Sequence, residues 1–566
     1  MGLLPTNHGS IRHPFLGYML IFVLLINACE TIPKKVAVDN QNIPEESRAR
    51  ESMIWKNYTG ETDDPKIPEL FDYSYAGYKR GEHGIPETFE DHAVFNVMDY
   101  GAIPNDTLSD QEAIQAAINA AELHQGGIVF FPPGEYLVNV SPIKSNPITI
   151  TSSNIILKGS GWGIHGTTIN MKDHMLQSYP DQEEWKVNYM FKFYPVEKFS
   201  EDAALIISSA KAGDDVIEVA KIDPFKDAKF IQLTMPYNLE AAKAALKGKE
   251  ARPHWEKVNE KGVTFIEFHE IDHIKGHRIY LKDPLINDIN LAYHWNAKPY
   301  TALENVGVED IYFKANFQDE YIHHKDFIHD NAWSIIAMSK MANSWVRRCR
   351  FSNITGAVVM DNSHASSILM LMIDGNAGHK LTNVTKSSRV LTGLINDQTN
   401  NGQFHGAAMS HWTSGSVIWR VKTPKQGWDS HADIPKNNLV DLYEGSKMTN
   451  HGGFYKNEPH HLEGLTLWNY KRVGDTINNY DFWKLSGKDM YWGFSVVNPI
   501  IVGLHGSTTT FNEKNVGYLE SLGEFVLPES LYEAQLKYRM KKTPKWLLES
   551  LKHWQAMESK WLQKKS

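Results

Sequence analysis

A 22-residue spacing between apolar segments in the middle of the chain restricts the fold more than any other feature. Ile336 is followed at this spacing by Val358, and a second, interleaved series runs from Val346 to Ile368. Two strand series that share one period are typical of the successive sides of a coil in a solenoid. We therefore expect Val358 to stack on Ile336, and Ile368 on Val346, in parallel strands.

Asparagine recurs at turn-like positions of the same region. Asn305, Asn353 and Asn383 each precede a valine or an isoleucine. Asparagine tolerates the left-handed backbone conformation that tight corners require, and stacked asparagines can form hydrogen-bonded ladders. We expect these three residues to mark successive corners of the solenoid.

The segment 99–138 combines a helix with two short strands and reads DYGAIPNDTLSDQEAIQAAINAAELHQGGIVFFPPGEYLV. Ser109 and Glu112 form a capping-box pattern, which predicts the helix start. Five small or apolar residues then fall on one narrow helical face: Ala113, Ile114, Ala117, Ile118 and Ala121. The Gly126-Gly127 pair predicts the end of the helix, and the runs 128–131 and 136–138 predict strands around a Pro-Gly turn.

This segment resembles the N-terminal cap and first coil of the pectate-lyase-like right-handed parallel β-helix proteins, in which the helix closes the open end of the solenoid. The resemblance concerns the fold, because the same opening precedes lyases, hydrolases and phage tailspikes. With the regions described below, it predicts an all-β chain. Its architecture is a right-handed parallel β-helix with an N-terminal capping helix, a β-rich insertion and a helical C-terminal tail.

The sequence divides into six regions. We expect a signal peptide at 1–28, a tether and N-terminal arm at 29–90, and the cap with the first coils at 91–173. Residues 174–300 interrupt the coil rhythm with alternating apolar runs and a short Ala-rich helix, which predicts a β-rich insertion. Coils that carry the site follow at 301–505, and amphipathic helices are expected within the tail, 506–566.

The N-terminus carries a targeting segment. An apolar run, 15–26, follows two basic residues and is too short for a membrane span. It ends in INAC, residues 26–29, which resembles a bacterial lipobox with asparagine in place of the usual small residue. The resemblance implies that Cys29 is lipidated and anchors the protein in the bacterial cell envelope, at the outer membrane or facing the periplasm. An ordinary signal peptide is the alternative.

Composition excludes one class of partner. The formal net charge is -9, and no large basic tract occurs outside the extreme C-terminus, so nucleic acid is not expected to bind. An anionic substrate must then be met by local cations. The 16 Trp and 24 Tyr are core residues or sugar-stacking platforms.

If Cys29 carries lipid, Cys349 is the only other cysteine and no intrachain disulfide forms.

Histidines gather in the coil region. Of 25 histidines, 11 lie in the segment 323–461, at positions 323, 324, 329, 364, 379, 405, 411, 431, 451, 460 and 461. Parallel coils bring residues one period apart into register, so one face can collect histidines that are distant in sequence. The densest stretch is 405–441. We predict the catalytic residues His405, His411, His431 and Arg420, and the substrate-binding residues His364, Arg348, Trp428 and Asp429.

These residue types suit the removal of the C5 proton of a uronate. The resulting carbanion lies beside a carboxylate, so the enzyme must neutralise that carboxylate with a cation. It must also place a base near the proton and an acid near the C4 leaving group, and histidine, with a pKa of ~6.5, can serve as either. Four arginines are candidate cations: Arg347, Arg348, Arg389 and Arg420. Asp429 could orient a histidine.

Other chemistries stay open. A glycosidase needs paired carboxylates, and adjacent aspartates occur only at 63–64 and 214–215, in the arm and the insertion. Calcium is a possible cofactor, because Asp397, Asp429 and Asp433 offer oxygen ligands. A transition metal is not favoured, since no closely spaced histidine pair of the H-x-H or H-x-x-x-H type occurs on this coil face.

The whole chain resembles β-helix lipoproteins associated with polysaccharide breakdown in marine and gut bacteria. That resemblance implies a carbon–oxygen lyase that acts by β-elimination on an anionic, ulvan-type glycan. We expect an oligosaccharide dehydratase, which expels the C4 hydroxyl and leaves a 4,5-unsaturated uronate at the non-reducing end. A polysaccharide lyase, which expels the next sugar, is the first alternative. A glycoside hydrolase and a non-catalytic surface glycan-binding protein are further alternatives.

Overall fold

The structure is a computed structural model that describes residues 49–87, 91–141, 146–163, 165–179, 181–196, 202–446, 453, 455–457, 459–474, 478–483 and 494–563. Cys29 and the expected signal peptide lie outside these residues. Within them, no helix is both long and apolar enough to cross a membrane. The account below concerns the unit that begins at Arg48.

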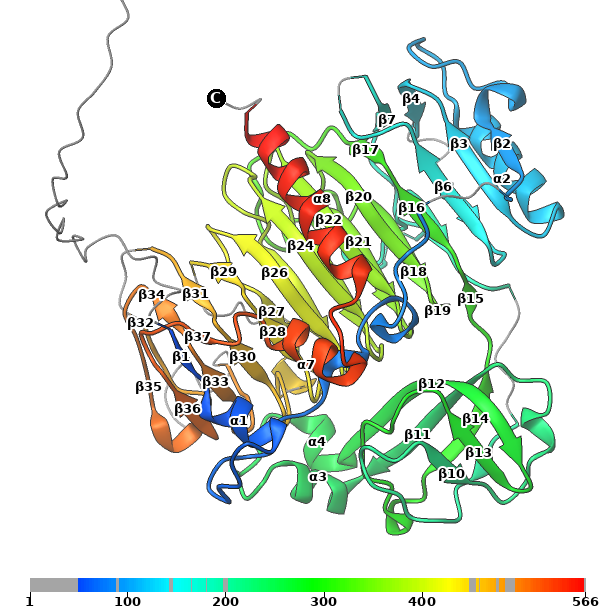
Figure 1. Cartoon of the computed structure of the whole chain (residues 1–566). Coiled ribbons are helices and arrows are strands. Elements are labelled where there is room, and N and C mark those ends of the chain that lie inside the picture. The colour runs from blue at the N-terminus through cyan, green and yellow to red at the C-terminus, as the bar shows by residue number, and fades with distance from the viewer. Residues whose placement is uncertain are drawn as a thin grey trace, which may run out of the picture. The chain divides into compact units, whose positions relative to one another are not determined.

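A parallel β-helix with three walls forms the body of this unit (Figure 1), which confirms the fold class expected from the sequence. The first wall consists of β2 (Val94–Asn96), β3 (Gly127–Phe131), β6 (Ile155–Gly159), β16 (Gly307–Glu309), the first halves of β20 (Trp345–Ser352), β22 (Ser367–Asp374), β24 (Leu391–Asp397) and β26 (Val417–Thr423), then β28 (Leu439–Asp441), β30 (Thr466–Trp468), β33 (Ile500–Val502) and β36 (Tyr518–Glu520).

The second wall continues from the same strands around a corner. It consists of β4 (Gly134–Val138), β7 (Thr167–Met171), β17 (Ile311–Lys314), the second halves of β20, β22, β24 and β26, then β29 (Glu444–Gly445), β31 (Lys471–Arg472) and β34 (His505–Gly506). The third wall consists of β5 (Ile148–Ile150), β8 (Phe191–Phe193), β18 (Ser334–Ser339), β21 (Gly356–Asp361), β23 (Lys380–Thr385), β25 (His405–Ser410) and β27 (Asp429–Ser430).

One residue in the left-handed conformation bends each long strand from the first wall to the second. These residues are Arg348, Met370, Leu394 and Arg420, with φ of 52°, 58°, 55° and 52°. A non-glycine residue in this region costs about 1–2 kcal/mol, so each corner is held by what packs on it. Met370 and Leu394 pack against the C-terminal helices. The corner side chains therefore contact segments outside the coil.

The stacking predicted from the 22-residue spacing is confirmed. Ile336 pairs with Val358 in the third wall, and Val346 pairs with Ile368 in the first. All four side chains are buried in one apolar core that runs through the coils.

The predicted asparagine corners are correct in part. Asn305 and Asn353 adopt φ of 53° and 55°, but Asn383 lies within the extended strand β23, where its side chain marks no corner. Hydroxyl groups instead link neighbouring coils: the N–H of Ser344 donates to Ser366 Oγ at 3.1 Å. Serine serves here because its side chain is short enough to accept a backbone hydrogen bond at a tight turn.

The expected cap is present as α2 (Gln111–Leu123), whose apolar face enters the core of the coils. The predicted capping box is wrong by one position. Asp110 is the N-cap residue, and its carboxylate accepts the N–H groups of Ile103 and Leu137, at 2.7 and 2.8 Å, rather than one inside the helix. A tertiary contact thus replaced the local one that the sequence pattern indicated.

Two terminal segments cover the outer face of the first two walls. The C-terminal helices α7 (Leu531–Met540) and α8 (Lys545–Leu562) pack there, and α8 lies across β20, β22 and β24 in Figure 1. The N-terminal arm joins the same apolar cluster through α1 (Met53–Thr59), and β1 (Arg50–Glu51) pairs with β37 (Val526–Leu527). This covering leaves the third wall as the face on which the histidines gather.

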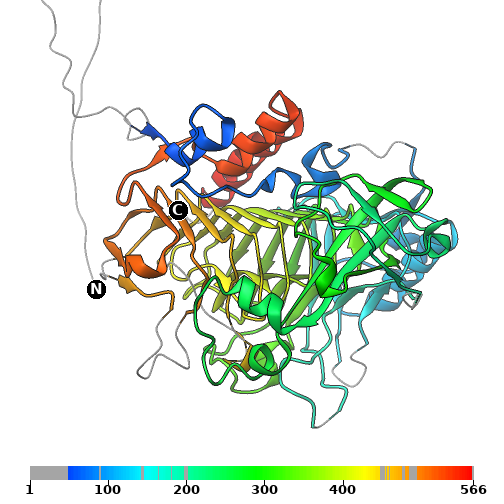
Figure 2. The same cartoon turned by 90° about the horizontal axis from the view of Figure 1, so that it is seen from below.

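Residues 204–300 form a six-stranded antiparallel sheet beside the coils (Figure 2). Its strands are β9 (Ala204–Leu205), β10 (Val216–Glu218), β11 (Phe230–Asn238), β12 (Val263–Lys275), β13 (Arg278–Leu281) and β14 (Asn296–Tyr300), and it carries α3 (Leu239–Ala245) and α4 (Glu256–Lys261). The remaining short pairs are β15 (Leu303–Glu304) with β19 (Met341–Ala342), and β32 (Asn478–Tyr480) with β35 (Thr509–Phe511).

Candidate active site

Three of the residues predicted from the sequence meet on the third wall. His405 begins β25, and Asp429 begins β27, the next strand of that wall. Oδ2 of Asp429 lies 2.9 Å from Nδ1 of His405 and 2.8 Å from Nδ1 of His431. Burial alone would raise the pKa of Asp429, but the two imidazoles hold it well below its usual range. One buried carboxylate therefore orients two histidines.

His431 is the accessible member of this group. Its side chain is 33% exposed, whereas His405 and Asp429 are buried. Because Nδ1–H of His431 donates to the Asp429 carboxylate, Nε2 carries the lone pair. An exposed imidazole oriented in this way can act as a general base.

Three residues that the sequence did not single out complete this group. His379 directly precedes β23, and Lys380 pairs in register with His405. His323 comes from the loop before α5 (Phe327–Asp330), and its ring centroid lies 5.4 Å from that of His379 and 5.3 Å from that of His405. We refer to His323, His379, Lys380, His405, Asp429 and His431 as the histidine cluster. The adjacent pair at 323–324 was the signal that could have drawn attention to the loop.

A buried aspartate, Asp330, fastens that loop to the wall. Its carboxylate accepts the N–H of His324 at 3.1 Å and lies 2.6 Å from Nδ1 of the same residue. Its backbone carbonyl accepts a hydrogen bond from Nδ1 of His379 at 2.8 Å. Asp330 therefore binds the loop through His324 and the wall through His379.

Lys380 is the cation of the histidine cluster. Burial lowers its pKa to about 8, although the carboxylates of Asp330 and Asp429 oppose that shift. Burial also lowers the pKa of His323 to about 3, and lowers those of His379 and His405. Near neutral pH the cluster thus holds an ammonium group among the neutral imidazoles of His323, His379 and His405.

His411 lies on the same wall but faces another carboxylate. It follows the end of β25, and its Nε2 lies 3.7 Å from Oδ2 of Asp433. Its Nδ1 lies 3.0 Å from the hydroxyl of Thr385, and burial lowers its pKa to about 4. The structure places His411 beside the cluster rather than within it.

Arg420 does not reach the histidine cluster, contrary to the expectation that it meets a bound carboxylate there. It occupies the left-handed corner of β26, where Nε donates to Glu533 at 2.6 Å and Nη1 to Glu529 at 3.0 Å. Because the corner directs the side chain to the outside of the coil, the C-terminal segment neutralises it.

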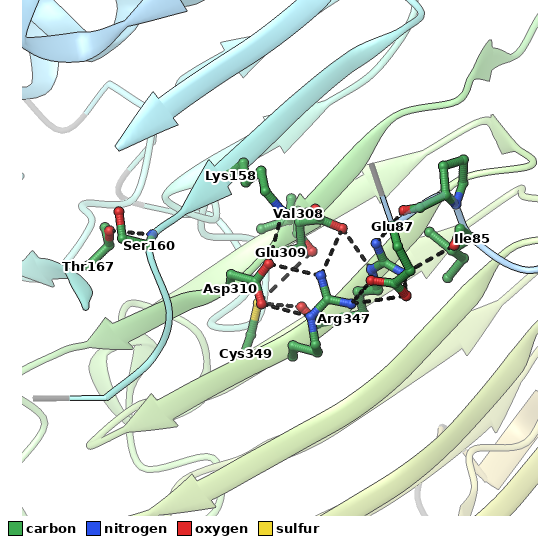
Figure 3. Close-up of polar contacts among 12 residues, drawn as sticks. Ile85, Glu87, Lys158, Ser160, Thr167, Val308, Glu309, Asp310, Arg347 and Cys349 are labelled. Atoms are coloured by element: carbon green, nitrogen blue, oxygen red, sulfur yellow. Dashed lines mark hydrogen bonds and ion pairs between the residues drawn. The ribbon is translucent and has the colours of Figure 1, made fainter. Parts of the chain in front are cut away.

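Arg348 is likewise engaged elsewhere. It holds the corner of β20, and its guanidinium binds Asp310 at 2.7 Å and Glu87 at 3.0 Å. Figure 3 shows the surrounding network, in which Arg347 also contacts Glu87 and Glu309. This network attaches the N-terminal arm to the coils, which leaves Arg348 no role in the predicted substrate site.

The structure places Trp428, a predicted substrate-binding residue, in the interior of the coils. Its side chain is fully buried in the core of the coils, and its ring packs edge-on at 6.2 Å from Phe494. A stacking platform must expose a ring face, so the interpretation of Trp428 as a substrate-binding residue is wrong.

His364 belongs to a second buried network, which joins the insertion to the coils. Its Nε2 lies 3.4 Å from Oδ1 of Asp283. The other Asp283 oxygen lies 2.9 Å from Nδ1 of His269 and accepts a hydrogen bond from Nε of Arg389 at 2.8 Å. All these side chains are buried, so His364 and Arg389 do not contact substrate.

The stability of the protein is expected to fall as the pH rises from about 6.5 to 9. Burial alone would lower the pKa of His269, but Asp283 and Glu267 raise it from 6.5 to about 9. The folded state then binds the proton more tightly, so this stabilisation is complete below pH 6.5 and is lost through about pH 9. Melting temperatures measured across this range should fall for the wild type and change less for His269→Gln. Parallel curves would contradict the prediction.

Two overlapping triads in the histidine cluster have ligand atoms close enough to hold a metal ion: His323 with His379 and His405, and His405 with Asp429 and His431. Glu184, His324 and Asp330 form another candidate. The first triad offers nitrogen only. That donor set does not suit calcium, which prefers several oxygen ligands.

Two parts of the chain match known sequence families. Residues 94–189 match the model described as rhamnogalacturonase A/epimerase, pectate lyase-like, which covers the cap and first coils. Residues 402–550 match a domain of unknown function, DUF4955, which runs from β25 to the first residues of α8 and includes three members of the histidine cluster.

Short stretches are similar to curated enzymes of Azotobacter vinelandii. Mannuronan C5-epimerase AlgE6 is 40% identical over 83 residues, which is 15% of this chain and 9% of that protein. Alginate lyase 7 is 42% identical over 69 residues, which is 12% of this chain and 8% of that protein. The matches thus span less than a tenth of either relative.

The solved structures to which this chain is similar have low sequence identity. The tailspike protein gp49 from Pseudomonas phage LKA1 is 12% identical, with 76% of this chain and 81% of that chain covered and a TM-score of 0.40. The A-module of Azotobacter vinelandii mannuronan C5-epimerase AlgE4 is 13% identical, with 76% and 92% covered and a TM-score of 0.31.

Proposed function

We propose that the protein is a carbon–oxygen lyase that acts on a uronate of an anionic, ulvan-type glycan. The observation that carries the proposal is the Asp429–His431 pair, whose imidazole is 33% exposed, on the wall where Lys380 lies in register with His405. A uronate presents both an acidic C5–H bond and a carboxylate, and this pair of groups matches them. The names of the similar enzymes refer to mannuronan and alginate, whose sugars are uronates, which supports the same substrate class.

The proposed elimination uses one base and one cation. Nε2 of His431 takes the proton from C5, and the electron pair spreads into the carboxylate, whose charge Lys380 offsets. The C4–O bond then breaks, the C4–C5 double bond forms, and the proton held by His431 can leave with the departing oxygen. Lys380 takes the role that the sequence had suggested for Arg420.

Within this class we propose a dehydratase, whose leaving group is the C4 hydroxyl of a terminal uronate. Lys257 of α4 binds Asp433, two residues beyond His431, at 2.7 Å. The insertion thus contacts the wall next to the base, and a closed end there would leave space for a hydroxyl but not for a further sugar. A polysaccharide lyase, in which the next sugar leaves, is the second candidate.

The first experiment follows ultraviolet absorbance and product mass with uronate-terminated oligosaccharides. We expect absorbance to rise, because both eliminations create a conjugated 4,5-unsaturated uronate. Loss of one water with the chain length retained identifies the dehydratase, whereas two fragments whose masses sum to that of the substrate identify the lyase. Flat absorbance with shortened products would indicate hydrolysis, and no change at all would indicate a binding protein.

We further propose that the protein is attached to the cell envelope through Cys29. This rests on the sequence before that residue, which resembles a lipobox. Attachment would keep the enzyme where oligosaccharides enter the cell.

A further inference from the structure

Three imidazoles of the histidine cluster lie close enough together to hold one ion. One ligand-type nitrogen from each of His323, His379 and His405 lies within 4.8 Å of the other two. His379 and His405 are only 3% and 4% exposed. Their Nε2 atoms, like that of His323, have no hydrogen-bond partner in the part of the chain that the structure describes. An unpaired buried polar atom costs about 1–3 kcal/mol, so three together require a compensating interaction.

The Nδ1 atoms of these rings indicate which kind of partner the Nε2 atoms need. Nδ1 of His379 donates to the carbonyl of Asp330, because a carbonyl can only accept. Nδ1 of His405 faces the ionised carboxylate of Asp429 at 2.9 Å, which also only accepts. In His379 the proton is therefore on Nδ1, and Nε2 presents a lone pair. In His405 the neighbouring carboxylate favours the same tautomer. A bound cation can accept all three Nε2 lone pairs at once, whereas a water molecule has only two protons to donate.

We propose that His323, His379 and His405 bind one divalent transition-metal ion, such as Zn²⁺, through their Nε2 atoms. Neutral imidazole is a common ligand of Zn²⁺ and its first-row neighbours, whereas Ca²⁺ and Mg²⁺ prefer oxygen. Three protein ligands leave a fourth position of a tetrahedral site open, as in catalytic zinc sites. Asp429 and the Asp330 carbonyl hold the rings behind the ligands, as carboxylates and carbonyls do in such sites.

The role of this ion in catalysis rests on the proposed function. If bound, the ion would add positive charge to the cluster that contains Lys380, where the uronate carboxylate would bind. A dication at that point would supply the charge that the predicted arginines do not bring to the site. It would also explain why His323, His379 and His405 are imidazoles instead of carboxylates.

Metal titration of the full chain without substrate tests the site directly. The protein is treated with a chelator, dialysed, and titrated with Co²⁺, whose visible spectrum distinguishes tetrahedral from octahedral coordination. We expect saturation at one equivalent with a tetrahedral spectrum, and displacement of Co²⁺ by Zn²⁺. Absence of saturable binding, or an octahedral spectrum, would overturn the proposal.

Variants locate the ion. His323→Gln and His379→Gln should each weaken Co²⁺ binding by at least tenfold, because each removes one of three ligands while keeping a polar side chain of similar size. His411→Gln, on the same wall but outside the triad, should bind as the wild type does. Equal affinity in His379→Gln, or weakening only in His431→Gln, would place the ion elsewhere and overturn the assignment. Circular dichroism of each variant confirms that the fold is retained.

The two proposals fail in distinguishable ways. Tight binding of Co²⁺ with no absorbance increase on any uronate would leave the metal site standing and overturn the lyase. If chelator-treated protein binds no Co²⁺ but catalyses the elimination at an unchanged rate, the lyase stands and the metal site is overturned.

Discussion

Replacing His431 with alanine is expected to lower kcat by about 10²–10⁴-fold while the fold is retained. This is the usual contribution of a positioned general base. The side chain is 33% exposed and packs little apolar surface, so its loss should change the melting temperature little. The measurement is the initial rate of absorbance increase on the uronate substrate, with a thermal melt of the same sample.

Asp429→Asn and His553→Ala supply the matched controls. The first keeps the shape of the side chain but removes the charge that fixes the tautomer of His431, so kcat should also fall strongly. His553 is an exposed histidine on α8, and its removal should leave the rate within experimental error. Full activity of His431→Ala would exclude the proposed base, whatever the other variants show.

Replacing Asp283 with alanine is expected to lower the free energy of unfolding by about 3–5 kcal/mol. Asp283 is fully buried against His269 and Arg389, which are buried as well. Removing one partner leaves uncompensated buried positive charge, and this costs far more than the intact pair contributes. Urea unfolding followed by fluorescence measures the change.

Asp288→Ala is the matched control from the same insertion. Asp288 pairs with Lys211, but the two side chains are 54% and 79% exposed, so its loss should cost less than about 1 kcal/mol. Asp283→Asn, which keeps the shape, provides a measurable variant if the alanine form does not accumulate. Similar losses for Asp283→Asn and Asp288→Ala would show that the buried network does not attach the insertion.

The sequence alone determined the solenoid and its cap. Val358 stacks on Ile336 because a repeated apolar pattern specifies repeated packing, and each coil contacts mainly its neighbours. The buried face of α2 could also be read from helical periodicity. These features depend on residues that are close in sequence or one period apart.

The sequence also identified part of the histidine cluster, through His405, Asp429 and His431. It could not supply Lys380, because the register between coils is not uniform. Lys380 lies opposite His405, 25 residues later, whereas Ile336 and Val358 are 22 apart. Loops of different length between the strands shift the pairing, and no local pattern records that shift.

Only the tertiary structure decided which cations face the site. Arg348 and Arg420 occupy left-handed corners whose side chains point outward, and Glu87 and Glu533 bind them there. Glu533 lies 113 residues after Arg420, on a helix whose position follows from its apolar packing on the outer walls. Repetition in the sequence thus determined the coils, whereas long-range packing determined which charged side chains were neutralised and which remained available for chemistry.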